Sequence, residues 1–312
     1  MSKRLWALAL GCCMLASCGG GGGGGSDAGG GSTGGGGGGY TKVVETFADL
    51  TATTITRPRF IAFDGSGNLY VAGGITNEIA RINPSNTVQT VIKSVPVLNG
   101  PVGVTIKGTE LYWSQTDGLY KLSLADLTSA GGTQTVTGYF QSASCLNCLG
   151  LLTNGSTVYA ARNGSSNDVF TFSTTNGSLG LPSNFSLNGL AMSTDGAMLV
   201  TAEYGAPTSA VNLFNIPVGP GSLSLRGSFT LTGTTYAVAV ASNGDLYVSN
   251  YSDSTVTRIH QGQLTTFIDA TVLCHPTGLA IRSGYLYVAN EAGCASQGRS
   301  KGFIIRATID ES

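Results

Sequence analysis

Residues able to carry acid–base chemistry are few in this chain of 312 residues. Only two histidines occur, and His275, beside Cys274, is the candidate general base because an imidazole titrates near neutral pH. A hydrogen-bonded loop histidine is the alternative role. Glu203 is the second catalytic candidate, and no Gly-Xaa-Ser-Xaa-Gly motif supplies a serine nucleophile. The sequence therefore contains no matched acid–base pair.

The cysteines could serve redox chemistry or disulfide bonding. Seven are present, but Cys12 and Cys13 lie in a leader and Cys18 is expected to carry a lipid, which leaves four. An even number in an exported protein predicts two disulfides. Cys145 and Cys148 have the spacing of a redox pair, but such pairs sit at a helix N-terminus and no helix is expected there. A structural disulfide between these two cysteines is favoured.

The N-terminus has the features of an export and anchoring signal. Residues 1–17 begin with positive charge and continue with an apolar stretch that is too short to span a bilayer. The segment 15–18, Leu-Ala-Ser-Cys, resembles the bacterial lipobox, which implies that Cys18 is lipidated, for example with palmitate. Gly19 after it, in place of aspartate, implies the outer membrane of the cell envelope. An unlipidated signal peptide is the alternative.

Residues 18–39 are almost pure glycine and predict a flexible tether with a reach of roughly 25 Å. The remainder, residues 40–312, is long enough for a closed all-β ring. Charged residues make up only 11% of the chain and the net charge is −1, which argues against nucleic-acid binding and against electrostatic attraction to a membrane.

One phrase recurs six times in this remainder: an apolar run, a turn with glycine, and a second apolar run. The clearest copies are residues 60–72, 236–250 and 278–290. The centres of the second runs are separated by 40 to 48 residues and fall at Tyr70, Tyr112, Tyr159, Leu199, Tyr247 and Tyr287. Strand-type patterning with this period predicts an all-β fold, a six-bladed β-propeller.

Each copy is expected to supply four antiparallel strands, counted outward from the central channel. The fifth copy shows them best, at residues 237–241, 246–249, 255–259 and 264–268. The hairpin between its first two strands contains Asn243-Gly244, a pair that favours positive φ at both turn positions. The equivalent pairs are Ser66-Gly67, Lys107-Gly108, Asn154-Gly155, Asp195-Gly196 and Ser283-Gly284.

The last copy ends after its third strand, residues 303–308. Its missing outer strand is predicted at the other end of the domain, because residues 42–50 resemble residues 263–270 of blade five. The N-terminal strand would then close the ring and cover an exposed sheet edge. Deleting residues 40–50 should therefore destabilise the whole ring.

Loops that enter inner strands and loops that leave second strands share one face, where they surround the channel mouth. Neutral amides dominate these positions, which suits hydrogen bonding to a neutral polar ligand. The predicted ligand contacts are Arg59, Gln115, Arg162, Asn188, Tyr236, Asn250 and Asn290, and the same face carries Asn147, Glu203, His275 and Glu291.

The remaining cysteines, Cys274 and Cys294, flank the first two strands of blade six on this same face, so they can form a disulfide. A four-cysteine zinc site with Cys145 and Cys148 would require blades three and six to meet, yet these blades lie opposite each other in the ring.

Residues 243–250 (Asn-Gly-Asp-Leu-Tyr-Val-Ser-Asn), 254–259 (Ser-Thr-Val-Thr-Arg-Ile) and 276–281 (Pro-Thr-Gly-Leu-Ala-Ile) resemble six-bladed propellers of the NHL-repeat and SMP-30/gluconolactonase type. The resemblance covers nearly all of residues 41–309. It implies the fold strongly and the function weakly, because such rings host lactonases, lyases and binding modules.

The SMP-30 resemblance also implies a calcium site in the channel, held by a glutamate, asparagines and an aspartate. Asn188 matches the asparagine-bearing strand start of that family, and Asn147 lies at the matching place one blade earlier. The family's glutamate falls near Arg59 and its aspartate near Tyr236, so two ligand positions are changed, and Glu203 would have to substitute. Otherwise the two asparagines satisfy loop backbone groups.

Two functions follow from these features. The first is a membrane-anchored binding or scaffold module that recognises a peptide, a glycan or another polar ligand at the channel mouth. The alternative is a divalent-metal-dependent lactonase, hydrolase or lyase, and a structural assembly lipoprotein is a third. Three or more converging carboxylate or amide oxygens would favour the enzyme, whereas a channel plugged by Arg59 and Tyr236 would argue against it.

Overall fold

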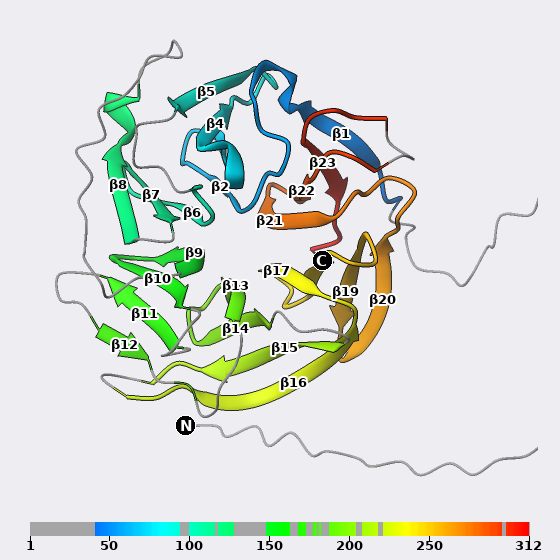
Figure 1. The fold of residues 1–312 in the computed structure, drawn as a ribbon. Coiled ribbons are helices and arrows are strands. Elements are labelled where there is room, and N and C mark those ends of the chain that lie inside the picture. Colours follow the sequence, from blue (N-terminus) through cyan, green and yellow to red (C-terminus); the bar gives the residue numbers. More distant parts are fainter. Residues whose placement is uncertain are drawn as a thin grey trace, which may run out of the picture. The chain divides into compact units, whose positions relative to one another are not determined.

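A ring of antiparallel sheets forms the described part of the chain (Figure 1). The computed structural model describes residues 41–93, 100–115, 118–127, 148–162, 168–172, 177–179, 181, 187–203, 208–217, 221–294 and 298–311. Within these residues, 23 strands form six sheets. The six-bladed β-propeller predicted from the repeats is therefore confirmed.

Each blade follows the chain from its innermost strand outward. Blades one and two contain β2 (Ile61–Phe63), β3 (Leu69–Ala72), β4 (Glu78–Ile82) and β5 (Val88–Lys93), then β6 (Val104–Lys107), β7 (Glu110–Gln115) and β8 (Gly118–Ser123). Blades three and four contain β9 (Cys148–Asn154), β10 (Thr157–Arg162), β11 (Asp168–Phe172) and β12 (Gly177–Leu179), then β13 (Leu187–Met192), β14 (Met198–Glu203), β15 (Thr208–Asn215) and β16 (Ser224–Thr232). Blades five and six contain β17 (Thr235–Val240), β18 (Leu246–Asn250), β19 (Thr255–His260) and β20 (Gln263–Ile268), then β21 (Pro276–Arg282), β22 (Tyr285–Asn290), β23 (Phe303–Thr308) and β1 (Val44–Asp49).

The hydrophobic core lies between neighbouring blades. One apolar cluster joins blade six to blade one, and another joins blade four to blade five. The repeated tyrosine of the second strand takes part in this packing: the ring of Tyr287 in blade six meets that of Phe63 in blade one edge-on, with 4.7 Å between centroids. Flat sheets with two apolar faces thus stack around an axis, which explains why the repeat carries strand patterning without helices.

The hairpins between first and second strands confirm the predicted turn glycines and correct one detail. Every one of the six glycines has positive φ, from 55° at Gly155 to 89° at Gly244. Only the Ser283-Gly284 turn also has positive φ at its first residue, 51° at Ser283. At Gly67 and Gly244 the glycine instead follows a turn in which its N–H donates to the carbonyl three residues earlier. One left-handed residue is therefore enough in five of the six turns.

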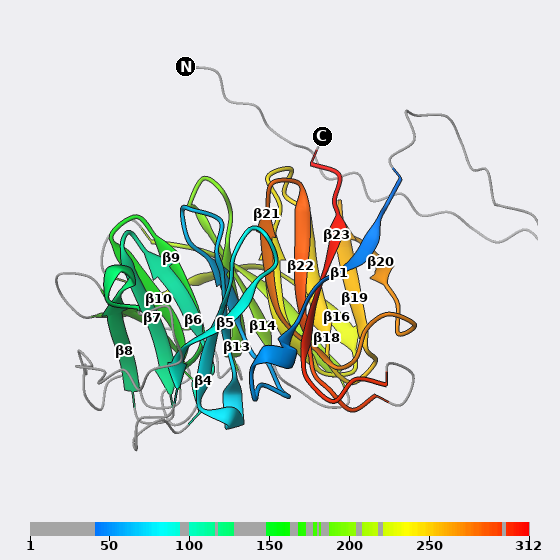
Figure 2. The same cartoon turned by 90° about the horizontal axis from the view of Figure 1, so that it is seen from above.

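The N-terminal strand closes the ring as predicted. β1 pairs antiparallel with β23, so that the sheet of blade six has the order β1-β23-β22-β21 (Figure 2). Phe47 is buried and its ring meets that of Tyr287 edge-on at 5.0 Å. Lys42 Nζ donates to the carbonyl of Phe267 in blade five. The two ends of the chain are therefore held in one blade, which in turn contacts its neighbour.

Glycine allows the inner strands to approach closely at the centre of the ring. A Cβ atom at Gly278 would lie 2.4 Å from the carbonyl oxygen of Arg59, and one at Gly103 would lie 2.0 Å from that of Leu149. These distances are far below van der Waals contact, so larger residues would force the blades apart. The close approach narrows the channel and brings residues at the strand starts together.

The described residues contain three short 3-10 helices, η1 (Leu50–Ala52), η2 (Gly74–Thr76) and η3 (Leu124–Asp126). None of the helices found in these residues is long and apolar enough to cross a bilayer.

Candidate functional site at the channel mouth

The starts of the inner strands are irregular where they reach the predicted face. The pairing of β17 with β18 shifts between Thr235 and Val238, and that of β21 with β22 shifts between Pro276 and Leu279. Such bulges change the direction in which nearby side chains point. They occur beside Tyr236 and His275, two of the residues singled out from the sequence.

Six side chains gather at this place and are called here the mouth cluster: Arg57, Arg59, Tyr236, Tyr251, His275 and Glu291. Its centre is Arg59, whose Nη1 lies 3.2 Å from Glu291 Oε1 and donates to Tyr236 Oη at 3.2 Å. Arg59 comes from blade one and Tyr236 from blade five. Because blade six lies between these two blades in the ring, the hydrogen bond between Arg59 and Tyr236 spans the width of blade six at the channel mouth.

Glu291 is the single carboxylate of the mouth cluster, and its side chain is only 3% exposed. Tyr251 donates its hydroxyl to Oε2 at 3.0 Å, and Arg57 Nε lies 3.7 Å from the same oxygen. Arg57 itself is 52% exposed. The buried carboxylate is thus compensated by two guanidinium groups, one partly buried and one at the rim.

Aromatic rings line the same cluster. The ring of His275 stacks on that of Tyr251 at 4.9 Å, and Tyr251 lies 6.1 Å from Tyr236. The Arg59 guanidinium carbon lies 5.5 Å from the centroid of Tyr236, within cation–π range. Three neighbouring rings therefore run from blade five to the edge of blade six, with Tyr236 buried and Tyr251 and His275 partly exposed.

Burial and charge shift the titration of these groups. Burial raises the pKa of Tyr236 to about 12, although Arg59 acts to lower it. Burial, and secondly the charge of Glu291, raise the pKa of Tyr251. For Arg59, burial acts to lower the pKa, but Tyr236 and Glu291 outweigh it and the pKa is raised. Near neutral pH both tyrosines are therefore protonated and Arg59 is charged.

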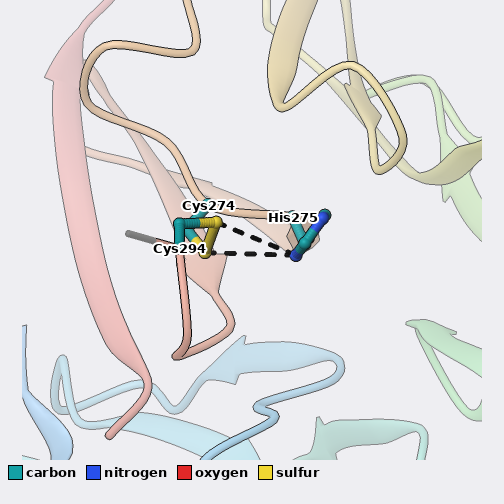
Figure 3. A group of neighbouring side chains, drawn as sticks. All are labelled: Cys274, His275 and Cys294. Carbon is teal, nitrogen blue, oxygen red and sulfur yellow. Dashed lines mark hydrogen bonds between the residues drawn. A yellow bond between two sulfur atoms is a disulfide. The ribbon is translucent and has the colours of Figure 1, made fainter. Parts of the chain in front are cut away.

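The predicted disulfide between Cys274 and Cys294 is present, with 5.7 Å between the Cα atoms (Figure 3). The N–H of Glu291 donates to the carbonyl of Cys274 at 3.0 Å. The disulfide therefore fixes the chain just beyond Glu291 to the start of β21, which orders one wall of the mouth cluster.

Two predicted ligand contacts have structural hydrogen bonds instead. Asn250 Nδ2 donates to the carbonyl of Thr232 at 2.6 Å and to Asp253 at 3.0 Å. Asn290 Oδ1 accepts from the N–H of Cys274 at 3.1 Å, and its amide nitrogen donates to the carbonyl of Val288 at 3.0 Å. Both side chains stabilise loops around the mouth, which is the usual role of asparagine at such positions.

In the described part of the chain, no hydrogen bond or ion pair joins the residues predicted from blades two to four to the mouth cluster. Arg162 pairs with Asp168 on the adjacent strand, with 2.6 Å between Nε and Oδ1. Glu203 accepts a long bond, 3.5 Å, from Asn212. Gln115 is buried at the end of β7, and neither polar atom of its side chain has a hydrogen-bond partner among the described residues. Asn188 is buried in β13.

Three of the predicted positions, Cys18, Cys145 and Asn147, lie outside the described residues. Cys148, the predicted partner of Cys145, is a buried disulfide cysteine at the start of β9. The predicted pairing of these two cysteines therefore stays a prediction, as does the lipidation of Cys18.

Two members of the mouth cluster, Arg57 and Tyr251, were not among the residues named for this face. Tyr251 directly follows Asn250, and Arg57 precedes Arg59 by two residues, so both lie in loops that had been assigned to the mouth. The sequence points to these two residues only through their position: Tyr251 is an aromatic residue next to Asn250, and Arg57 is a cationic residue close to Arg59. A search one or two residues further along each loop would have included them.

The calcium site implied by the family resemblance fits these residues poorly. The mouth cluster offers one carboxylate, Glu291, which already has two guanidinium partners. In the described part of the chain no three carboxylates lie close enough to share a cation. A Ca²⁺ ion needs six to eight oxygen ligands and would face the charge of Arg59 directly. We therefore derive no chemical step through calcium.

Comparison with known proteins gives the fold alone. No family model and no curated protein matches the sequence. Among solved structures, a luciferin-regenerating enzyme matches with a TM-score of 0.65 and 14% identity, over 86% of this chain and 95% of its own. A gluconolactonase from Xanthomonas campestris matches with a TM-score of 0.64 and 11% identity, over 86% and 90%. Regucalcin from Agrobacterium tumefaciens, a calcium-binding protein, matches with a TM-score of 0.61 and 12% identity, over 84% and 92%.

Lyases and sugar dehydrogenases have the same ring. The chain thus has a six-bladed propeller that is similar in fold to those of the gluconolactonase and of regucalcin. Since proteins with this ring carry out several unrelated reactions, the arrangement of the site itself must indicate the function.

Proposed function

We propose that this propeller is a binding module that recognises a neutral polar ligand, a glycan, at its channel mouth. The observation that supports it is the bond from Arg59 to Tyr236, which links blades one and five and orders an aromatic surface beside a neutralised carboxylate. Aromatic faces pack against the C–H groups of a sugar ring, and fixed polar groups bond its hydroxyls. A peptide is the second ligand class that such a surface can take.

The charge balance of the mouth cluster supports a neutral ligand. Glu291 and Arg59 compensate each other, and the second guanidinium, on Arg57, lies at the exposed rim. Neither Glu291 nor Arg59 is an isolated charge that would select an oppositely charged ligand. Hydrogen bonding and stacking on Tyr251 and His275 would then provide most of the affinity.

Binding is tested by measuring the affinity of the purified protein for an array of glycans and peptides. Tyr251→Ala, which removes the stacked ring, should weaken glycan binding at least tenfold, whereas Tyr251→Phe should weaken it less. Tyr285→Ala, at the other end of a blade-six strand, is the matched control and should bind normally. Equal binding by wild type and Tyr251→Ala would overturn the proposal, and selective binding of peptides would replace the glycan as ligand.

A metal-dependent lactonase, hydrolase or lyase is the second candidate. Its support is the shared ring of the gluconolactonase and of calcium-binding regucalcin. Arg59 weighs against it, because this guanidinium lies where the family resemblance places an acidic ligand. Calcium at millimolar concentration should leave the melting temperature within about 1 °C, since only ligands of the native state raise it. A shift of several degrees, removed by a chelator, would favour the enzyme.

We also propose that the propeller is held in the bacterial envelope by a lipid on Cys18, on the outer membrane. The support is the Leu-Ala-Ser-Cys segment, the glycine after it and the glycine-rich tether. Cys18→Ser should abolish incorporation of labelled palmitate and release the protein from the membrane fraction. Retention of the label in this variant would contradict lipidation, and separation of inner from outer membranes tests the location.

A further inference from the structure

One group at the rim of the mouth cluster has no role in the proposed binding of a glycan: Cys274, Cys294 and the nitrogen Nδ1 of His275. This nitrogen lies 4.0 Å from Cys274 Sγ and 3.9 Å from Cys294 Sγ (Figure 3). It is therefore nearly equidistant from both sulfur atoms. Among the described residues this is the one group of three potential metal ligands from histidine, cysteine or acidic residues.

The imidazole is held in this orientation from several sides. The backbone of His275 has φ of +43°, which is uncommon for a residue with a side chain. The backbone N–H of His275 donates to Ser254 Oγ at 3.2 Å. The ring stacks on Tyr251. Figure 3 shows Nδ1 directed at the disulfide and the other ring nitrogen directed away from it. His275 Nδ1 is therefore already directed at the two sulfur atoms before any metal binds.

The environment of the disulfide favours its exchange with an external thiol. Cys274 is buried, but Cys294 and His275 are only partly so, which leaves access from one side. A hydrogen-bond donor beside a sulfur atom stabilises the thiolate that leaves when a disulfide is attacked. His275 is placed to stabilise either sulfur, because the two distances are nearly the same.

We propose that reduction of the Cys274–Cys294 disulfide creates a site for a soft d¹⁰ cation, Zn²⁺ or Cu⁺, held by both sulfurs and His275 Nδ1. A dithiol gives two electrons and two protons to the disulfide, which becomes two thiols, while the dithiol becomes a cyclic disulfide. The cation then replaces the two thiol protons, which pass to solvent, and Nδ1 donates its lone pair. Thiolate and imidazole are the ligands these cations prefer.

The distances suit such a site. With Zn–S bonds of about 2.3 Å and a Zn–N bond of about 2.0–2.1 Å, a tetrahedral or trigonal centre places the nitrogen about 3.5–3.8 Å from each sulfur. The imidazole nitrogen is already within a few tenths of an ångström of that separation. Once the covalent bond is broken, only the sulfurs need to move apart, and the partly exposed side leaves room for a water as fourth ligand on Zn²⁺.

The metal site shares the His275 ring with the proposed glycan site, but it uses the ring nitrogen rather than the ring face, and metal binding is measured without any glycan. It also differs from a four-cysteine site, since it needs one blade only. It assigns a redox-dependent role to a disulfide that otherwise only fixes the loop after β22 (Tyr285–Asn290).

The test compares the oxidised full-length protein with the same protein reduced by a phosphine, which takes up water and becomes its oxide. Zn²⁺ and Cu⁺ are added separately, without oxygen, in competition with chromophoric chelators. Reduced wild type should bind one equivalent of Zn²⁺ or Cu⁺ more than the oxidised protein. The Cys274→Ser/Cys294→Ser variant keeps Cys145 and Cys148 and so measures any binding at that second pair.

Single variants test the third ligand. His275→Ala should lower the affinity of the reduced protein at least tenfold, whereas His260→Ala, the control with the other histidine, should not change it. If the Cys274→Ser/Cys294→Ser variant fails to fold, a Cys145→Ser/Cys148→Ser variant, which keeps the blade-six pair, is compared in its oxidised and reduced forms instead. Equal metal binding in both forms, or wild-type affinity in His275→Ala, would overturn the proposal.

Discussion

The two halves of the channel mouth use similar residue types in different ways. On the side of blades five, six and one, long side chains bond across blade boundaries: Arg59 reaches both Glu291 and Tyr236. On the side of blades two to four, two of the predicted residues find partners within their own blade: Arg162 pairs with Asp168, and Glu203 accepts from Asn212. The first half also contains the Cys274–Cys294 disulfide and the strand that closes the ring.

The difference shows that position on the mouth face is not sufficient to form a site. A side chain must be long enough to cross the gap between blades, and its own blade must not offer a closer partner. Asp168 lies on the strand next to Arg162 and pairs with it, whereas the nearest acid to Arg59 is on blade six. The location of partners on neighbouring strands thus decides which positively charged residue links blades.

The largest effect should come from removing the strand that closes the cross-linked half. Deleting residues 40–50 removes β1 and exposes the surface that Phe47 and Leu50 cover. Loss of these two side chains alone costs about 3–6 kcal/mol, which is comparable to the net stability of many domains. When urea denaturation is monitored by circular dichroism, we expect the cooperative unfolding transition to be lost.

Asp49→Ala is the matched control for this deletion. Asp49 pairs with Arg299 at the surface, so its loss should lower the free energy of unfolding by less than about 1 kcal/mol. A deletion variant that still unfolds cooperatively near the wild-type midpoint would show that blade six does not need its N-terminal strand.

The next effect compares one glutamate from each half. Glu291→Gln removes the charge that compensates Arg59 and should lower the free energy of unfolding by about 2–3 kcal/mol. Glu203→Gln, on the other half, should lower it by less than about 1 kcal/mol because Glu203 is only partly buried. Urea denaturation of both variants measures the difference, and equal losses would remove the distinction between the two halves.

The hydroxyl of Tyr236 should make the cross-linked half sensitive to alkaline pH. Its pKa is raised from 10 to about 12 by burial, so the folded state keeps a proton that the unfolded state loses. The contribution to stability is complete below pH 10 and falls by about 1.4 kcal/mol per pH unit as pH rises towards 12.

Tyr236→Phe should therefore be less stable than wild type at pH 8, because it lacks the bond from Arg59, and should lose less stability above pH 10. Chemical denaturation between pH 8 and pH 11 follows the two proteins. Parallel decreases in the free energy of unfolding would mean that this hydroxyl does not titrate with folding.

The smallest effect should come from the rim of the same network. Arg57 is about half exposed and 3.7 Å from Glu291, so Arg57→Ala should change the free energy of unfolding by less than about 1 kcal/mol. Added salt should reduce even that change, because surface pairs are screened. A loss as large as that of Glu291→Gln would place Arg57, rather than Arg59, at the centre of the network.

Much of this architecture could be predicted because it follows from local chemistry. Glycine at 67, 108, 155, 196, 244 and 284 marks the hairpins, and the similarity of residues 42–50 to residues 263–270 indicates the closing strand. The disulfide of blade six followed from placing both cysteines on one face. The contacts of Arg59 and Tyr251 could not be predicted, because they depend on how far neighbouring blades are rotated and separated.

The sequence by itself determined the number of blades, the turns and the face on which loops converge, because strand alternation and turn glycines act over a few residues. Only the tertiary structure decided which of those loop residues form a site. Arg59 meets Tyr236 because glycine lets the inner strands approach and because bulges redirect the strand starts. Such contacts join residues 177 positions apart, and no local pattern records a distance across the ring.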